Sequence, residues 1–305
     1  MLATLDNRVT ARAEAAYLGL ALGDALGATV EFMTPREIRA AFARSGGLHR
    51  EIVGGGWLRL KPGQVTDDTT MSLALGDAIL ADGGEVEPLS CARAFDAWMR
   101  AKPVDIGNTV RRNLITFRKS GDPVAPASEH DAGNGAAMRV LPVALATLGR
   151  AEGEVRAALC AQAHVTHHNA VSDAACAFLA LSVQDALRGA NLRDIYRRRI
   201  APFVAANPQF AFRARRRENP SGWVVETLQA VVQALLGTDS FENCVVDVVN
   251  RGGDADTTGA IAGMLAGALY GPAGLPFRWL DKLDPTIRER CRAQAQALVS
   301  CSPAA

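Results

Sequence analysis

The stretch NRGGDADTTGAIAGMLAGALYG, residues 250–271, decides how this chain folds. Its first half follows two glycines with a cluster of oxygen-bearing side chains: Asp254, Asp256, Thr257 and Thr258. Carboxylates and hydroxyls are the ligands that Mg²⁺ and Mn²⁺ prefer. We therefore interpret the stretch as half of a divalent metal site at the start of a helix.

The second half of this stretch carries glycine at every fourth position, and an early segment has the same spacing of small residues. The two sets are Gly259, Gly263, Gly267 and Gly271, and Ala15, Gly19, Gly23 and Gly27. Residues four apart share one face of a helix. Because glycine costs a helix about 1 kcal/mol relative to alanine, this spacing needs a packing reason. We expect a central pair of closely packed helices with functional loops at their ends.

Apolar residues elsewhere follow helical spacing between glycine and proline breaks, so we predict an all-α fold. No composition shift divides the chain, which favours one domain over residues 1–305 with short flexible tails at about 1–8 and 300–305. The predicted helices are 10–26, 35–44, 69–81, 88–100, 105–119, 136–147, 152–164, 170–188, 191–205, 222–236, 240–249, 257–269 and 284–299.

Charge and cysteine usage exclude several classes of protein. The 305 residues include 33 basic and 32 acidic side chains, a net charge of +1, which gives no electrostatic basis for binding nucleic acid. Six scattered cysteines suit reduced thiols. The longest apolar run, residues 260–270, falls short of the ~20 residues that span a bilayer, and no signal peptide is recognisable. We expect a cytoplasmic protein.

A second oxygen cluster, Thr66, Asp67, Asp68 and Thr69, also follows a glycine-bearing loop and precedes an apolar helix. Taken alone, such a cluster is explained by helix capping. Two matching clusters change this interpretation, since carboxylates ~4 Å apart repel by about 4 kcal/mol even at an effective dielectric of 20. If the two helix starts meet, a binuclear cation site relieves that repulsion.

Three further segments carry candidate ligand contacts. Glu31 is a loop acid or an active-site acid, and Asp105 and Asn108 either cap a helix or face a polyhydroxyl ligand. The small-residue loop Gly133, Asn134 and Gly135 offers backbone N–H groups to phosphate, with Arg139 nearby. Neither a P-loop nor a strand-flanked GxGxxG motif occurs.

The histidine and arginine clusters leave alternatives open. His164, His167 and His168 fit no zinc spacing with the cysteines, so His167 is interpreted as a ligand contact or a structural residue. The arginine runs at 197–199 and 213–217 are solvated surface or a docking face for an acidic partner.

The segments GDALGATVEF, GGGWLRLKPGQVTDDTTMSLALG, KPVDIGNT, DAGNGAAMR and NRGGDADTTGAIAGMLAG together resemble the ADP-ribosylglycohydrolase family, over about residues 10–290. The resemblance implies an all-α, single-domain hydrolase with a binuclear Mn²⁺ or Mg²⁺ centre at helix N-termini. The metal ligands that it implies are Thr66, Asp67, Asp68, Asp254, Asp256 and Thr257.

The same resemblance assigns the other site residues. It makes Glu31 and Asp105 the catalytic carboxylates without deciding which moves the proton. Asn108 contacts the ribose, and the loop Gly133, Asn134 and Gly135 takes the phosphates. His167 lies against the ADP portion. Trp223 is a substrate contact at a position where the family is expected to have a tyrosine, so the ring surface is kept and the hydroxyl is absent.

The implied reaction is hydrolysis of the N-glycosidic bond between ADP-ribose and an arginine of dinitrogenase reductase, the nitrogenase iron protein. That reaction is a post-translational control of nitrogen fixation. The resemblance also implies control by PII-type signalling proteins and peripheral membrane association through an ammonium channel. Two alternatives stay open: an ADP-ribosyl hydrolase of another modified protein or small molecule, and a non-catalytic module that binds ADP-ribose.

Overall fold

The computed structural model describes the backbone of residues 2–304 and the side chains of residues 7–304. Within this range the regular structure is helical apart from two isolated bridges, Gly55 with Leu60 and Gly133 with Trp223, which confirms the all-α prediction. The α-helices are α1 (Leu2–Gly27), α2 (Pro35–Ala41), α3 (Asp67–Ala81), α4 (Pro88–Arg100), α5 (Asn108–Ser120), α6 (Leu141–Ala146), α7 (Glu152–Ala163), α8 (Ala170–Leu187), α9 (Leu192–Ile195), α10 (Ala201–Ala206), α11 (Val224–Gly237), α12 (Phe241–Val249), α13 (Ala255–Tyr270), α14 (Phe277–Lys282) and α15 (Pro285–Ser300).

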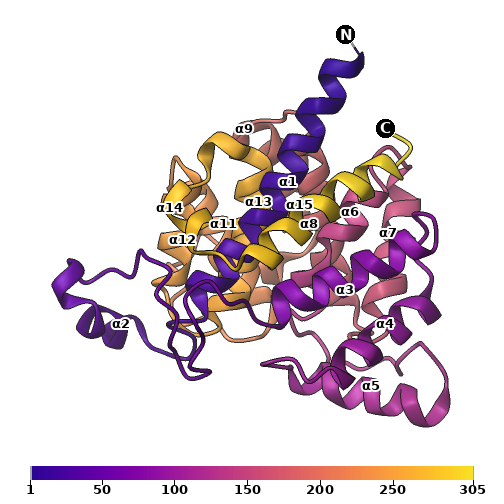
Figure 1. Ribbon diagram of the computed structural model, residues 1–305, viewed down its shortest axis with the longest axis horizontal. Coiled ribbons are helices and arrows are strands. Elements are labelled where there is room, and N and C mark those ends of the chain that lie inside the picture. Colours follow the sequence, from indigo (N-terminus) through magenta and orange to yellow (C-terminus); the bar gives the residue numbers. More distant parts are fainter. Residues whose placement is uncertain (1, 305) are drawn as a thin grey trace.

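Helices α1 and α13 pack side by side through the middle of the molecule (Figure 1). The contact is backbone on backbone: a Cβ added to Gly23 would lie 2.0 Å from the carbonyl oxygen of Gly259, and one added to Gly263 would lie 2.0 Å from that of Gly19. The helices run antiparallel, since Gly267 meets Ala15 at the far end. The glycine spacing therefore predicted the central pair correctly.

Gly271 departs from this pattern because it ends α13 with a φ of 70°. An added Cβ there would lie 3.8 Å from the side chain of Arg12, its nearest neighbour. The Arg12 guanidinium donates to the carbonyl oxygens of Ala268 and Leu269 at 2.6 and 2.7 Å. A cation at this end satisfies carbonyls that have no partner within the helix.

Apolar faces of the surrounding helices close around this pair into one contiguous core. Helix α8 begins at Asn169, whose side chain accepts from the N–H groups of Val171 and Ser172. By length and composition alone α8 could cross a membrane, but 78% of that segment is buried within the fold. Such burial is expected of a core helix whose surface is apolar all round.

Several helices differ from the sequence-based prediction. Helix α5 begins at Asn108, three residues later than predicted, and the short helix α14 was missed. The single helix predicted over 191–205 is α9, a widened π turn over Tyr196–Ile200, and α10. Pro202 explains this break, because proline has no N–H and its ring collides with the carbonyl four residues earlier.

Defined structure extends into both segments predicted as short flexible tails, and their flexibility stays a prediction. Helix α1 already begins at Leu2, so residues 2–8 continue the helix. At the other end, the N–H of Ala304 donates to the carbonyl oxygen of Leu148 at 3.1 Å, and Ser302 is buried. Met1 and Ala305 lie outside the described residues.

Candidate metal centre and substrate cleft

The two oxygen clusters meet at the N-terminal ends of α3 and α13. One carboxylate oxygen of Asp68 accepts from Thr66 at 3.2 Å and from Thr257 at 3.3 Å. The other, Oδ1, is buried without a hydrogen-bond partner in the described part of the chain. Asp68 and Thr257, 189 positions apart along the chain, thus meet directly, and the Asp68 carboxylate keeps one oxygen free for a further ligand.

Asp24, on the last turns of α1, holds the first cluster in place. Its carboxylate accepts from the backbone N–H groups of Thr66 and Thr69, and from the Thr69 hydroxyl at 2.5 Å. Asp24 is fully buried, and burial raises its pKa to about 6. Asp24 therefore fastens the start of α3 to the central helix pair.

The second cluster gathers around Asp254, which precedes α13. One carboxylate oxygen from each of Glu31, Asp254 and Asp256 lies within 4.8 Å of the others. Asp254 occupies the N-cap position but makes no capping hydrogen bond, and its Oδ2 accepts from the Asn134 side chain at 2.6 Å. Helix capping therefore explains Thr66, which accepts from the N–H of Asp68, but not Asp254.

Burial and mutual repulsion raise the pKa values of these acids. Burial, followed by the charges of Asp105 and Asp24, raises the pKa of Asp67 to about 7. Burial likewise raises the pKa of Glu31 to about 8, with Asp254 and Asp105 adding to the effect. For Asp68 and Asp256 burial and the neighbouring carboxylates raise the pKa well above its ordinary range. The cluster therefore strongly disfavours its own negative charge.

This donor set fits divalent cations. Within the described residues, the hydrogen-bond donors to these acids are threonine, asparagine and tryptophan side chains and backbone N–H groups, with no lysine or arginine among them. Buried carboxylates without a cationic side chain need protons or metal ions. The free Oδ1 of Asp68, the carboxylates around Asp254 and the adjacent threonine hydroxyls are hard oxygen donors of the kind that Mg²⁺ and Mn²⁺ take.

A cleft of about 650 Å³ opens over the acids. Its lining includes most of the residues predicted for the site: Glu31, Asp67, Asp105, Asn108, Gly133, Asn134, Gly135, His167, Asp254, Asp256 and Thr257. Thr66 and Asp68 are fully buried beneath it. Asp105 precedes α5 but does not cap it, because the N-cap residue is Gly107. Its carboxylate is half-buried at the cleft.

The glycine loop lies directly on the ring of His167. A Cβ added to Gly135 would lie 2.7 Å from the His167 ring, so this position requires glycine. His167 Nδ1 is 2.8 Å from the Thr166 hydroxyl. Burial and two nearby arginines, Arg139 and Arg112, lower the pKa of His167 to about 3, which keeps the imidazole neutral.

Asn134 and Arg139 are placed differently from what the phosphate interpretation expects. The N–H of Asn134 donates to Gly222 O at 2.9 Å, and its amide donates to Asp254 and Thr227. Asn134 therefore joins the glycine loop to the acid cluster. Arg139 is fully buried, donates to Gln162 and Thr166, and lies over the Phe95 ring, so it does not face the cleft.

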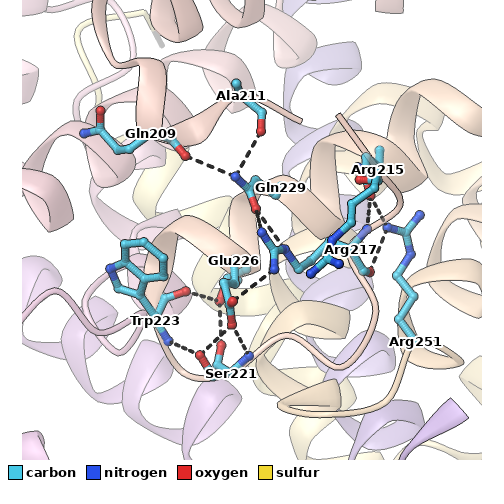
Figure 2. Close-up of polar contacts among 11 residues, drawn as sticks. Gln209, Ala211, Arg215, Arg217, Ser221, Trp223, Glu226, Gln229 and Arg251 are labelled. Carbon is cyan, nitrogen blue, oxygen red and sulfur yellow. Dashed lines mark hydrogen bonds and ion pairs between the residues drawn. The ribbon is translucent and has the colours of Figure 1, made fainter. Parts of the chain in front are cut away.

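Trp223 stands beside the cleft rather than in its lining, with 46% of its surface exposed. The segment before it, Asn219–Gly222, does line the cleft. Figure 2 shows how this segment is held: Glu226 accepts from the N–H and hydroxyl of Ser221 at 2.9 and 2.7 Å and pairs with Arg217. Arg217 also donates twice to Gln229.

Arg217 belongs to one of the two arginine runs. Others are paired as well, such as Arg199 with Asp185 and Glu152, and Arg216 with Asp247 and Glu218. Part of each run therefore serves the fold itself. Whether the runs also form a docking face stays a prediction.

Trp57 was not among the site residues predicted from the sequence, yet its indole N–H donates to Glu31 Oε2 at 2.5 Å. Its only sequence signal is the run of three glycines before it, Gly54, Gly55 and Gly56, all with positive φ. A second group, Cys160, His164 and Asp173, also brings its ligand atoms within 4.8 Å of one another outside the cleft. His164 and Asp173 are hydrogen-bonded at 2.9 Å.

Comparison with known proteins supports one interpretation of this geometry. The family model described as ADP-ribosylglycohydrolase matches residues 5–303. The chain is 47% identical to the ADP-ribosyl-[dinitrogen reductase] glycohydrolase of Rhodospirillum rubrum, over 95% of this chain and 96% of that protein. It is 32% identical to the ADP-ribosylarginine hydrolase Tri1 of Pseudomonas putida, over 89% and 74%.

A solved structure, titled ADP-ribosylglycohydrolase-related protein complex, superimposes with a TM-score of 0.84 at 35% identity. The alignment covers 97% of this chain and 99% of that one. The fold of this chain is therefore that of the solved relative.

Proposed function

This chain belongs to the ADP-ribosylglycohydrolase family, and we propose that it removes ADP-ribose from an ADP-ribosylated arginine of dinitrogenase reductase, which reactivates that protein. The observation that carries the proposal is the sharing of Asp68 between Thr66 and Thr257, which joins the two acid clusters under one cleft. The 47% identity to a relative named for this substrate supports the choice of target.

We assign metal binding to Thr66, Asp67, Asp68, Asp254, Asp256 and Thr257, with Glu31 close enough to join them. Two Mn²⁺ ions, or Mg²⁺ in their place, would supply positive charge that offsets these carboxylates and polarises water and ribose hydroxyls. Asn134 orients Asp254, and Asp24 fixes the position of Thr66, so the chain itself holds the donor atoms together.

The reaction adds water across the N-glycosidic bond: the oxygen goes to ribose C1, and a proton goes to the guanidine nitrogen that leaves. Glu31 and Asp105 are the carboxylates that we assign to this proton transfer. Glu31 is buried and oriented by Trp57, whereas Asp105 is half-buried at the cleft. The pH profiles of kcat for Glu31→Gln and Asp105→Asn decide between them, because only loss of the transferring group removes its limb of the profile.

The remaining cleft residues position the nucleotide. Asn108 is exposed at the first turn of α5 and lines the cleft, and we assign its amide to a ribose hydroxyl. The neutral His167 ring supports the glycine loop. Trp223 offers an exposed ring at the edge of the cleft for the adenosine end. We propose a cytoplasmic location for the reaction. Control by PII-type proteins and recruitment to an ammonium channel stay predictions of the family resemblance.

The test uses ADP-ribosylated dinitrogenase reductase, the purified protein and Mn²⁺, with release of ADP-ribose followed by mass spectrometry. Asp254→Asn should abolish release, whereas Asp281→Asn, an exposed acid outside the cleft, should leave it at the wild-type rate. Full activity of Asp254→Asn, or of metal-free protein, would contradict the metal assignment. A serine-linked substrate cleaved as fast as the arginine-linked one would contradict the bond assignment.

The second candidate is hydrolysis of ADP-ribose from a different arginine-modified protein, which the 32% identity to an ADP-ribosylarginine hydrolase favours. In this case the active site and the bond that is cleaved are the same, and only the protein that carries the ADP-ribosylated arginine differs. Activity on free ADP-ribosylarginine without activity on dinitrogenase reductase would select it.

A further inference from the structure

Two exposed aromatic rings, Phe32 and Trp57, stand together at the mouth of the cleft. Their centroids are 5.4 Å apart, both line the cleft, and 65% and 52% of their surfaces are exposed. We call this pair the aromatic rim. Paired rings of this size are normally buried, so their exposure next to a site indicates a contact that the chain alone does not supply.

The backbone holds Phe32 in an unfavourable conformation. Its φ is 63°, in the left-handed region that a bulky side chain rarely adopts. Hydrogen bonds to Gly253 fix this turn: the N–H of Phe32 donates to Gly253 O at 2.7 Å, and the N–H of Gly253 donates to Met33 O at 3.0 Å. Glycine or asparagine would fit with less strain, yet the position carries a ring.

The loop that carries Trp57 is held in place as well. Trp57 follows three glycines of positive φ, and a Cβ added to Gly56 would lie 2.3 Å from Ala28 O, so the loop is pressed against the end of α1. Paired N–H to O contacts of 2.7 and 2.9 Å between Gly55 and Leu60 close the turn. The indole N–H of Trp57 donates to Glu31, and about half of the Trp57 surface remains exposed for contact with another molecule.

The position of the rim identifies what covers it. Phe32 follows Glu31 directly and is bonded to the residue before Asp254, so the rim lies beside the acids where the N-glycosidic bond must sit. ADP-ribose lies on one side of that bond, inside the cleft. The arginine and its polypeptide lie on the other side, and a folded protein cannot enter a cleft of about 650 Å³.

We propose that the aromatic rim of Phe32 and Trp57 docks the polypeptide that flanks the ADP-ribosylated arginine, which selects a protein substrate over free ADP-ribosylarginine. The proposal rests on the proposed function and adds the recognition surface for its protein partner. Exposed aromatic anchors are the residue type that most often dominates protein interfaces.

The test compares kcat/KM for two substrates, arginine-ADP-ribosylated dinitrogenase reductase and free ADP-ribosylarginine. In Phe32→Asn and Phe32→Gly, both tolerant of positive φ, we expect the ratio of protein to small-substrate kcat/KM to fall about tenfold or more, mainly through KM for the protein. The matched control is Phe277→Asn, which removes a ring that is 80% exposed on α14, outside the cleft; its ratio should equal that of the wild type.

Three results would overturn the inference. An unchanged ratio in both Phe32 variants would show that the rim does not touch the polypeptide. An equal loss on both substrates would show that the rim contacts ADP-ribose or supports Glu31 instead. A wild type inactive on both substrates would refute the proposed function and, with it, the role of the aromatic rim. If the wild type cleaves both substrates, the proposed function stands, and either of the first two results counts against the aromatic rim alone.

Discussion

Replacing Gly23 by alanine tests whether the helix pair α1–α13 determines both the stability and the site. The added Cβ would lie 2.0 Å from Gly259 O and 2.4 Å from its carbonyl carbon. Restoring 3.4 Å, the shortest ordinary contact, requires the helices to part by about 1.4 Å. These are backbone atoms that cannot rotate away. The loss of unfolding free energy should therefore reach or exceed the upper end of the range for overpacked cores, about 3 kcal/mol.

Alanine has a higher helix propensity than glycine, which stabilises the variant by about 1 kcal/mol and offsets part of this loss. We therefore expect Gly23→Ala to lose about 2 kcal/mol or more of unfolding free energy, measured by urea denaturation. Gly153→Ala is the matched control, because Gly153 lies on α7 with nothing within 4 Å of an added Cβ. That variant should be at least as stable as the wild type.

The same substitution should also disturb the arrangement of the acids, because separating the helices by about 1.4 Å breaks the 3.3 Å contact between Thr257 and Asp68. Calorimetric titration with Mn²⁺ should show weaker binding in Gly23→Ala than in Gly153→Ala. If Gly23→Ala were as stable as the wild type and bound Mn²⁺ equally well, the close helix contact would not be what assembles the site.

Three further predictions concern the loops around the acids. Asn134→Leu removes the amide that donates to Asp254, and Mn²⁺ affinity should fall about 10–100-fold in calorimetry, with unchanged affinity as the contrary result. Glu226→Ala frees Ser221 before the Trp223 ring and should weaken ADP-ribose binding about tenfold; equal dissociation constants would show that this network does not shape the cleft. His167 has a pKa of about 3 in the folded protein and about 6.5 in the unfolded chain, so the unfolded chain takes up the proton first as the pH falls. The free energy of unfolding should therefore decrease below about pH 6.5, by about 2 kcal/mol between pH 7 and 5. Urea titrations of His167→Gln should show a shallower decline by this amount, and an equal decline would refute the assignment.

The fold could be predicted from the sequence to an unusual degree because its signals are local. Glycine at every fourth position implies a close helix contact wherever it occurs, and the structure places Gly19 against Gly263 as that spacing requires. The paired acid clusters were found for a similar reason. Each is a short string of residues at a helix start, and their likeness indicates a common site.

The features of the site that could not be predicted from the sequence depend on long-range packing. Arg139 follows a glycine-rich loop, which favours a phosphate contact, but Gln162 and Thr166 of another segment draw its guanidinium into the core. The contact of Trp57 with Glu31 joins two loops 26 residues apart, and no spacing rule relates them. Such contacts follow from the tertiary arrangement rather than from any local pattern.

The position of the acids at two helix N-termini raises the question of what stabilises their charge. The acids lie at the starts of α3 and α13, and each helix dipole favours a nearby anion by about 0.3–1 kcal/mol. Repulsion between two carboxylates ~4 Å apart is about 4 kcal/mol at an effective dielectric of 20, and Glu31, Asp254 and Asp256 already form three such pairs within 4.8 Å. The dipoles therefore offset only a small part of the repulsion, and protons or cations must supply the rest. The helix contact at Gly23 and Gly259 holds these acids together against that repulsion, so divalent cations that relieve it should stabilise the fold as well as complete the site.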